Sequence, residues 1–246
     1  MTKQGAESSR QSGTDYGYDL ASRVLYLDSN LIILDKPAGL AVHGGPKTFI
    51  HLEGMLDGLR LGLAKPPRLA HRLDRDTSGC LVLARHDKAL SRLGRLFGAG
   101  KVRKTYWAVV TGRPDPEEGV IEMPLRKVSN KDGWRMIADP AGQAAATRWR
   151  RLGGTTLETW LELHPQSGRT HQIRVHCASG LGCPIIGDPV YGSADDRPMH
   201  LHARHLVIPY WADRPPVEAI AVPPPHMRAA LRDCGWPGED EAEQEC

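Results

Sequence analysis

Residues 71–84 read HRLDRDTSGCLVLA, a charged nine-residue segment that runs directly into five apolar residues. The apolar part, residues 80–84, has the composition of a strand buried on both faces, so the charged part is expected to be a loop that feeds a core strand. Asp74 lies in this loop between Arg72 and Arg75, and neighbouring positive charge favours an ionised carboxylate. An ionised Asp could serve there as a nucleophile or base. A turn cap or a structural Asp–Arg pair is the alternative interpretation.

Short strand-like runs dominate the chain on both sides of this segment. The expected strands cover residues 23–27, 31–34, 102–111, 119–122, 134–138, 146–151 and 155–163. Helices are expected over about 49–61, 87–98, 170–179 and 225–234. Asp87 and Thr170 are the expected N-caps of the second and third helices. Strands outnumber helices without regular β–α–β alternation, so the sequence predicts an α+β fold with a largely antiparallel sheet.

Length and composition favour one soluble domain. With 246 residues, 40% of them hydrophobic, the chain can bury one sizeable core. Its apolar runs fall far short of the roughly 18 residues needed to span a bilayer. Residues 21–235 are expected to form the domain, after a flexible polar lead (residues 1–20) and before an acidic tail (residues 236–246). The lead lacks a signal or transit pattern, and five cysteines without a CxxC pair suit free thiols, so a cytoplasmic location is expected.

The acidic ends of the chain mask a positive net charge on residues 21–235. The whole chain has 32 Lys and Arg against 29 Asp and Glu, but residues 1–20 hold two bases and three acids, and residues 236–246 hold five acids. Residues 21–235 therefore carry 30 bases against 21 acids. Within them, residues 68–104 carry ten Lys or Arg against three Asp. Such an excess is typical of a protein that contacts a phosphate backbone, although a solvated basic face gives the same pattern.

A second polar segment, GRTHQIRVH at residues 168–176, holds two arginines and two histidines at an expected helix start. An Arg there could pair with a buried Asp or with a phosphate, since helix N-termini favour anions. An ordinary polar helix end is the alternative. Tyr106 lies within the apolar strand KTYWAVV at residues 104–110, where it could face a site or belong to the core.

The sequence lacks patterns for metal, nucleotide and hydrolase chemistry. His200, His202 and His205 are close in sequence, but alternation along a strand would place His205 on the opposite face from the other two. No HExxH or cysteine pair completes a site, so no metal is expected. The chain also lacks GxxxxGK(S/T), a GxGxxG that follows a strand, and GxSxG, which argues against nucleotide hydrolysis, dinucleotide redox chemistry and α/β-hydrolase chemistry.

Six segments resemble, in order, the motifs of the RluA family of pseudouridine synthases. They are DKPAGLAVHGG (35–45), HRLDRDTSG (71–79), KTYWAVVTG (104–112), SGRTHQIRVH (167–176), CPIIGDPVYG (183–192) and LHARHL (201–206). The resemblance implies a mixed, largely antiparallel sheet with a central cleft and flanking helices. It also implies an isomerase that converts particular uridines of large-subunit rRNA, tRNA or both into pseudouridine. RNA is then the expected partner of a monomer that needs no cofactor and contacts no membrane.

Carried over residue by residue, the resemblance implies three catalytic residues. Asp74 would be the catalytic aspartate, Arg174 would form the ion pair that orients it, and Tyr106 would pack against the target base. Asp74 would either attack C1′ of the ribose or abstract a ribose proton, and the sequence leaves both routes open.

The resemblance also implies four substrate-binding residues. Arg72 would help to fill the space that a flipped uridine vacates, and Ile173 would line the pocket. Arg169 and His71, from the same two motifs, complete the set.

The sequence departs from the family in two places. Many relatives carry an S4-type RNA-binding domain, whereas only about 20 polar residues precede the first expected strand here, so docking would depend on the catalytic domain or on other partners. Residues 207–216, VIPYWADRPP, lack the Phe-x-His-Pro run of the family, which is expected to affect a sheet edge.

Two rival functions stay open. The first is a non-catalytic RNA-binding or ribosome-assembly factor of the same fold. The second is a glycosidase that uses Asp74 and Asp76 as a carboxylate pair. Neighbours on one turn rarely reach the separation of roughly 5 Å across a sugar that such chemistry needs.

Overall fold

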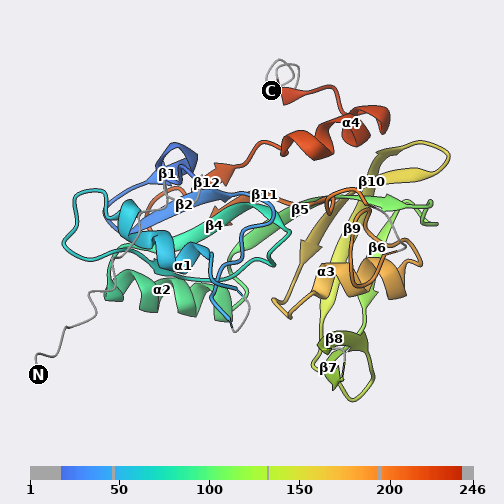
Figure 1. Cartoon of the computed structure of the whole chain (residues 1–246), viewed down its shortest axis with the longest axis horizontal. Coiled ribbons are helices and arrows are strands. Elements are labelled where there is room, and N and C mark those ends of the chain that lie inside the picture. Colours follow the sequence, from blue (N-terminus) through green and yellow to red (C-terminus); the bar gives the residue numbers. More distant parts are fainter. Residues whose placement is uncertain (1–17, 46–47, 132, 193–195, 240–246) are drawn as a thin grey trace, which may run out of the picture.

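The computed structural model describes residues 18–45, 48–131, 133–192 and 196–239 (Figure 1). Its strands are β1 (Val24–Leu27), β2 (Leu31–Lys36), β3 (Arg68–Leu69), β4 (Ser78–Ala84), β5 (Arg103–Thr111), β6 (Glu118–Glu122), β7 (Leu125–Asn130), β8 (Gly133–Ala138), β9 (Ala146–Gly154), β10 (Glu158–Pro165), β11 (Leu201–Ile208) and β12 (Val217–Ile220). Its α-helices are α1 (Leu52–Met55), α2 (Asp87–Gly98), α3 (Gln172–Val175) and α4 (Pro225–Asp233). Two 3-10 helices, η2 (Ala21–Arg23) and η3 (Leu56–Leu59), and a π-helix, η4 (His176–Gly180), complete the set.

One mixed sheet runs through the molecule in the order β1-β2-β4-β11-β5-β10-β9-β6, with β3 beside β4 and β12 beside β11. β4 and β11 are parallel, and the other strand pairs of this sheet are antiparallel. β7 and β8 form a separate antiparallel hairpin, which projects away from the sheet in Figure 1. The α+β class and the largely antiparallel sheet are confirmed.

Helices cover both faces of the sheet in the half that contains β2 and β4. Ile33 packs in one apolar cluster with Leu93 of α2, whereas its neighbour Ile32 packs in another cluster with Met55 of α1. Successive residues of a strand point to opposite faces, so α1 and α2 lie on opposite sides of β2. This double cover explains the continuous apolar runs at residues 31–34 of β2 and 80–84 of β4.

The other half repeats this arrangement around β5. Ala108 packs in a cluster with Ile173 of α3, and Val109 packs in a different cluster with Met227 of α4. α3 and α4 therefore cover opposite faces of β5. This packing holds α3, with the second polar segment of the sequence, against the central strand that carries Tyr106.

The first two predicted helices are correct only in part. α2 has the predicted bounds, but its N-cap is His86, whose Nδ1 accepts the N–H of Ala89 at 3.1 Å. Asp87 is instead the first helical residue. The helix expected over 49–61 is wrong in length, because the chain there forms only the short α1 and η3. Gly54 and Gly58 lower the helix propensity of that segment.

The helix expected over 170–179 is also wrong in form, since α3 gives way to the π-helix η4 after one turn. Thr170 is not its N-cap. His171, with a left-handed φ of 53°, occupies the capping position and makes no side-chain cap. The carbonyl oxygen of the Gln172 side chain accepts the N–H of Arg169 instead. Standard cap preferences do not anticipate such a turn.

Four strands, β3, β7, β11 and β12, lie outside the strands expected from the sequence. Residues 207–216 form the end of β11 and its connection to β12. Of the predicted lead and tail, residues 1–17 and 240–246 lie outside the described residues. The described cysteines are free and buried, namely Cys80, Cys177, Cys183 and Cys234.

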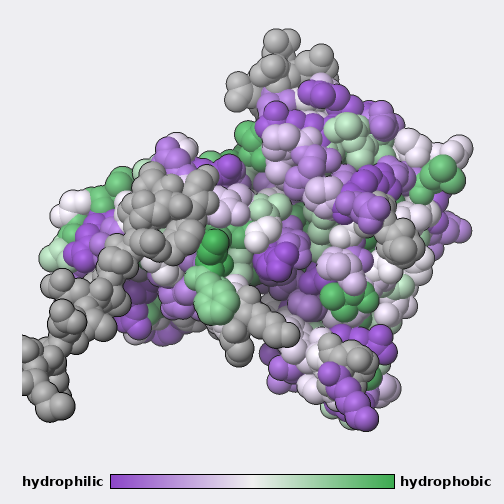
Figure 2. Space-filling view, viewed as in Figure 1, coloured by the Kyte–Doolittle hydropathy of each residue, from purple (hydrophilic) through white to green (hydrophobic). Residues whose placement is uncertain are grey.

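Hydrophilic side chains cover most of the face shown in Figure 2, and apolar ones lie in small groups between them. Within the described part of the chain, no helix is long and apolar enough to cross a membrane.

Candidate active site

A cavity of about 500 Å³ lies between the 71–77 loop, β5 and the segment that leads into α3. Its walls bring together polypeptide segments that are far apart in the sequence. Every residue predicted to be catalytic or to bind substrate lines this cavity: His71, Arg72, Asp74, Tyr106, Arg169, Ile173 and Arg174.

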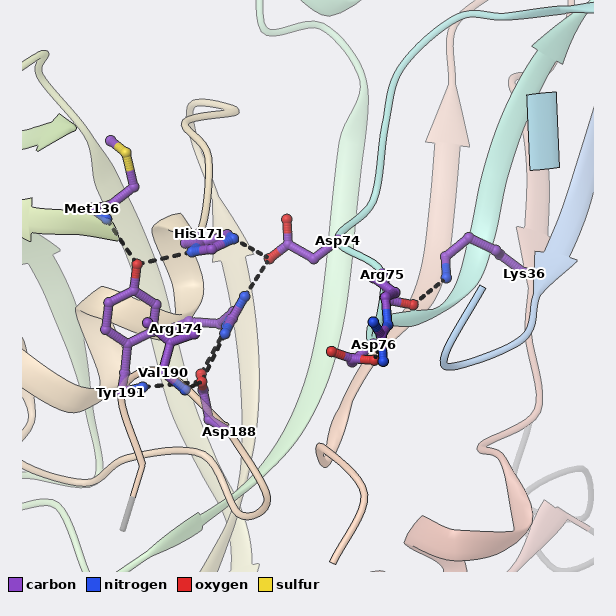
Figure 3. Close-up of polar contacts among 10 residues, drawn as sticks. All are labelled: Lys36, Asp74, Arg75, Asp76, Met136, His171, Arg174, Asp188, Val190 and Tyr191. Carbon is purple, nitrogen blue, oxygen red and sulfur yellow. Dashed lines mark hydrogen bonds and ion pairs between the residues drawn. The ribbon is translucent and has the colours of Figure 1, made fainter. Parts of the chain in front are cut away.

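Arg174 joins two carboxylates at the wall of the cavity (Figure 3). Its Nε and Nη2 donate to the two oxygens of Asp188 at 2.8 and 2.7 Å, and its Nη1 donates to Oδ2 of Asp74 at 3.3 Å. The Asp188 side chain is fully buried, whereas that of Asp74 is 19% exposed. Asp74 is therefore the carboxylate of this pair that a ligand in the cavity can reach.

Asp188 is fixed by its own backbone turn as well as by Arg174. Its Oδ1 accepts the N–H groups of Val190 at 2.9 Å and Tyr191 at 3.1 Å. Burial acts to raise the pKa of Asp188, but the hydrogen bonds and charge of Arg174 and the two N–H donors outweigh it and lower that pKa. The preceding Gly187, at φ +70°, leaves no room for a Cβ, which would lie 2.2 Å from the carbonyl oxygen of Arg197.

His171 also faces Asp74 from the start of α3. Its Nε2 lies 3.9 Å from Oδ2 of Asp74, and its Nδ1 lies 2.8 Å from the hydroxyl of Tyr191. Trp134 of β8 stacks on the imidazole with ring centres 5.0 Å apart. Burial lowers the pKa of His171, although the Asp74 charge opposes that effect. The ring is therefore neutral at pH 7.

Lys36, at the end of β2, contacts the 71–77 loop that carries Asp74. Its Nζ is buried and donates to the carbonyl oxygens of Pro37, Leu40 and Arg75 at 2.8 to 2.9 Å. Burial lowers the pKa of Lys36 to about 7, against nearby carboxylates that raise it. Three carbonyl acceptors match the three donors of an ammonium group, so Lys36 holds the loop next to Asp74 against the segment that follows β2.

The remaining predicted residues differ in how firmly they are held. Arg72 is exposed at the cavity, and Ile173 is buried in its wall. Burial, followed by the Asp74 charge, raises the pKa of Tyr106, so its phenol is neutral. Arg169 is exposed, although its Nε donates to the Ala144 carbonyl at 3.2 Å.

His71 has a structural role in addition to lining the cavity. Its Nε2 accepts the N–H of Val82 at 2.9 Å, and its ring stacks on Phe97 with centres 4.6 Å apart. These contacts fix the start of the 71–77 loop to β4 and α2. Contact between His71 and a substrate stays a prediction.

Four residues of the site were missed in the sequence: Lys36, Trp134, Asp188 and Tyr191. The sequence held a signal for three of them. Lys36 lies in DKPAG, and Asp188 and Tyr191 lie in GDPVYG, and both stretches belong to the motifs that resemble the RluA family. Trp134 carries no such signal. Only the position of the β7–β8 hairpin brings it to His171.

The glycosidase interpretation finds no matching geometry in the described part of the chain. Asp76 does not line the cavity and pairs with Arg75 at 3.3 Å, so it does not face Asp74 across a substrate site. No three described His, Cys, Asp or Glu side chains gather as metal ligands.

Comparison with known proteins identifies the family of this chain. Residues 30–179 match the family model described as RNA pseudouridylate synthase. The chain belongs to this family. An RNA pseudouridine synthase of Zymomonas mobilis is 48% identical over 77% of this chain and 88% of its own length. The mitochondrial pseudouridylate synthase RPUSD4 of Xenopus tropicalis is 32% identical over 95% of this chain and 87% of its own length.

A solved structure agrees with this assignment. Human RNA pseudouridylate synthase domain containing 4 aligns with a TM-score of 0.75 and 28% identity, over 87% of this chain and 94% of that one. The resemblance to the RluA family is thus confirmed, and the protein is an isomerase that acts on RNA.

Proposed function

We propose that Asp74 is the catalytic carboxylate and that the enzyme isomerises particular uridines of structured RNA, in large-subunit rRNA, tRNA or both. One observation carries this proposal: Asp74 is the partly exposed carboxylate in the cavity, and the buried Arg174 holds it by an ion pair. The Arg174 Nη1 atom lies 3.3 Å from Oδ2 of Asp74 and so fixes the position of the carboxylate at the cavity. Arg174 remains paired with Asp188 whatever the charge on Asp74 becomes during the reaction.

The isomerisation breaks the bond between uracil N1 and ribose C1′ and forms a bond between C5 and C1′. Asp74 starts it either by attack of a carboxylate oxygen on C1′ or by removal of a ribose proton. In both routes the base leaves, turns and is rejoined through C5, whose proton is lost while N1 gains one. Atoms and electrons balance within the uridine.

The cavity walls offer apolar side chains that can contact the uracil and cationic side chains that can contact the RNA phosphates. Tyr106 and Ile173 would pack against the uracil, while Arg72, which is exposed and lines the cavity, would enter the space that a flipped base leaves in the RNA. Arg169 and the half-buried Lys104 add positive charge at the same cavity. RNA binding of this kind is dominated by phosphate contacts and weakens as salt rises.

The proposal predicts that Asp74→Asn lowers turnover by about 1000-fold or more and leaves RNA affinity nearly unchanged, because the substitution removes the reacting charge and keeps the shape. The substrate is total RNA labelled with uridine tritiated at C5, from cells that lack the gene, since each isomerisation releases that tritium. Asp76→Asn is the matched control, because Asp76 lies two residues away and does not line the cavity. Equal loss of binding and turnover in Asp74→Asn would contradict the assignment.

The RNA itself is identified by mapping pseudouridines in rRNA and tRNA from that strain with wild-type or Asp74→Asn protein restored. Sites that only the wild type restores are the targets. If both proteins restore the same sites, or the deletion removes no site and wild-type protein releases no tritium, the catalytic proposal fails. Cytoplasmic location and a monomeric state also stay predictions, and similar proteins include mitochondrial ones.

A further inference from the structure

His171 occupies a backbone conformation that non-glycine residues rarely adopt. Its φ of 53° and ψ of 20° place it in the left-handed region, which costs an L-residue on the order of 1 kcal/mol. Such strain persists where the surrounding structure fixes the residue firmly. Here it turns the imidazole toward Asp74, with 13% of the side chain exposed at the cavity.

Two aromatic residues hold the imidazole ring in place. Trp134 stacks on it at an interplanar angle of 30°, and Tyr191 meets it edge-on with ring centres 5.6 Å apart. Trp134 is in turn covered by the ammonium of Lys127, 4.6 Å from its ring centre. The ring plane is thus set by contacts with the β7–β8 hairpin and with the turn after Asp188.

The hydrogen bonds of Tyr191 are compatible with a His171 tautomer that carries its proton on Nε2. The Tyr191 hydroxyl accepts the backbone N–H of Met136 at 3.0 Å, which leaves its own proton free to be donated to Nδ1 of His171. A neutral imidazole that accepts at Nδ1 carries its hydrogen on Nε2. That Nε2–H faces Oδ2 of Asp74.

His171 and Arg174 therefore approach the same oxygen of Asp74. Figure 3 shows Oδ2 turned toward both of them and the second oxygen turned away. Among the described residues, none donates a hydrogen bond to Oδ1. Within the described part of the chain, Arg174 alone donates to Oδ2 at hydrogen-bond distance, and the last torsion of an Asp side chain is broad, so a second donor on Oδ2 would narrow the rotation of the carboxylate.

We propose that His171 is a positioning residue of the synthase: its Nε2–H, held in place by Tyr191 and Trp134, joins Arg174 on Oδ2 of Asp74 and leaves Oδ1 as the oxygen that reacts with the ribose. This inference rests on the proposed role of Asp74. The Nε2···Oδ2 separation of 3.9 Å is longer than a hydrogen bond, and catalytic hydrogen bonds commonly shorten when substrate binds.

The expected effect of losing this donor is on the chemical step. His171→Phe keeps a ring for Trp134 to stack on and removes both nitrogens. We expect kcat to fall by about 10- to 100-fold with little change in KM, since misorientation of a reacting group has effects of this size. His171→Gln, whose amide N–H can reach toward Asp74, is expected to recover part of that loss.

Tyr191→Phe tests the tautomer. Without the hydroxyl, Nδ1 of His171 loses its donor, and the imidazole proton can move away from Nε2. We expect a smaller fall in kcat than for His171→Phe. Because both residues act through one N–H, the double variant should be no slower than His171→Phe alone.

The constants kcat and KM are measured in multiple turnover over a range of concentrations of the tritiated total RNA described above, single-turnover rates isolate the chemical step, and thermal unfolding of each variant is the check on folding. Wild-type-like kcat in His171→Phe, no recovery in His171→Gln, or additive losses in the double variant would overturn the positioning role. These results are distinguishable from failure of the proposed function, because that failure shows as activity retained by Asp74→Asn. If His171→Phe does not fold, His171→Gln and Tyr191→Phe still decide: equal, large losses in both would overturn it.

Discussion

Arg174 serves two carboxylates that differ in burial and in number of bonds. The fully buried Asp188 receives two short hydrogen bonds, and the partly exposed Asp74 receives one longer bond. A buried charge that loses its partner is far more costly than an exposed one. Asp188 is therefore the residue that keeps Arg174 in place, which allows Asp74 to change its charge without unfolding the site.

At this scale we predict that Asp188→Asn lowers the free energy of unfolding by about 3–5 kcal/mol and removes activity, because it leaves Arg174 buried without a full countercharge. Urea denaturation measures the first effect, and tritium release measures the second. Asp87→Asn is the control, since the Asp87 side chain is 81% exposed in its pair with Arg68 and such pairs contribute about 0–1 kcal/mol. Similar small losses in both variants would show that Asp188 does not anchor Arg174.

At the scale of elements, the parallel contact between β4 and β11 explains the glycine that ends HRLDRDTSG. Gly79 lies opposite Ala203 at φ +101°, and a Cβ there would lie 2.3 Å from the Ala203 carbonyl oxygen. The close approach of the two backbones places the 71–77 loop, and with it Asp74, at the central strands. No side chain fits between them.

We therefore expect Gly79→Ala to lower the free energy of unfolding by about 3 kcal/mol or more, since both the conformation and the space exclude a methyl group. Gly94→Ala in α2 provides the opposite case. Nothing lies within 4 Å of its Cβ position, and alanine should stabilise the helix by about 1 kcal/mol. Urea denaturation of both variants tests the pair, and a Gly79→Ala protein as stable as wild type would refute the close-contact argument.

Neutral histidines fasten β4 to its surroundings and make its stability depend on pH. His202 hydrogen-bonds the Ser78 hydroxyl at 2.8 Å and the Ala221 carbonyl at 2.8 Å, and His71 accepts the Val82 N–H. Burial lowers the pKa of His202 to about 4 and, with help from Lys104, that of His71 to about 3, from 6.5 in each case. Below pH 6.5 the unfolded chain therefore binds protons that the folded chain does not.

The expected result is full histidine-linked stability above pH 6.5 and a falling free energy of unfolding as the pH drops from 6.5 toward 4. Each of the two histidines contributes a loss that approaches about 1.4 kcal/mol per pH unit. Urea denaturation at pH 7 and pH 5 measures it. A His202→Asn variant should be less stable at pH 7 and lose less stability between the two values. If the free energy of unfolding of the variant falls as steeply with pH as that of the wild type, His202 is not a source of the pH dependence.

At the scale of the whole molecule, local patterns in the sequence predicted the secondary-structure elements well and the tertiary contacts poorly. α2 follows from apolar spacing, and the strands of the core follow from apolar runs bounded by turns. The hairpin strand β7 is polar, LRKVSN, so periodicity did not reveal it. The Asp74–Arg174 pair was predicted only through resemblance to a family. Its anchor on Asp188 and the Trp134–His171 stack depend on how distant segments pack, which no local pattern contains.

The pairing of Asp74 with Arg174, 100 residues later in the chain, has a consequence for protein synthesis. A ribosome-bound chain that has emerged only as far as β10 already contains the proposed catalytic carboxylate but not Arg174, Asp188 or Tyr191. Translation must therefore continue beyond Tyr191 before the site can be complete. Prematurely terminated products that fold in part would hold the carboxylate without its partners, and we expect that they do not modify RNA.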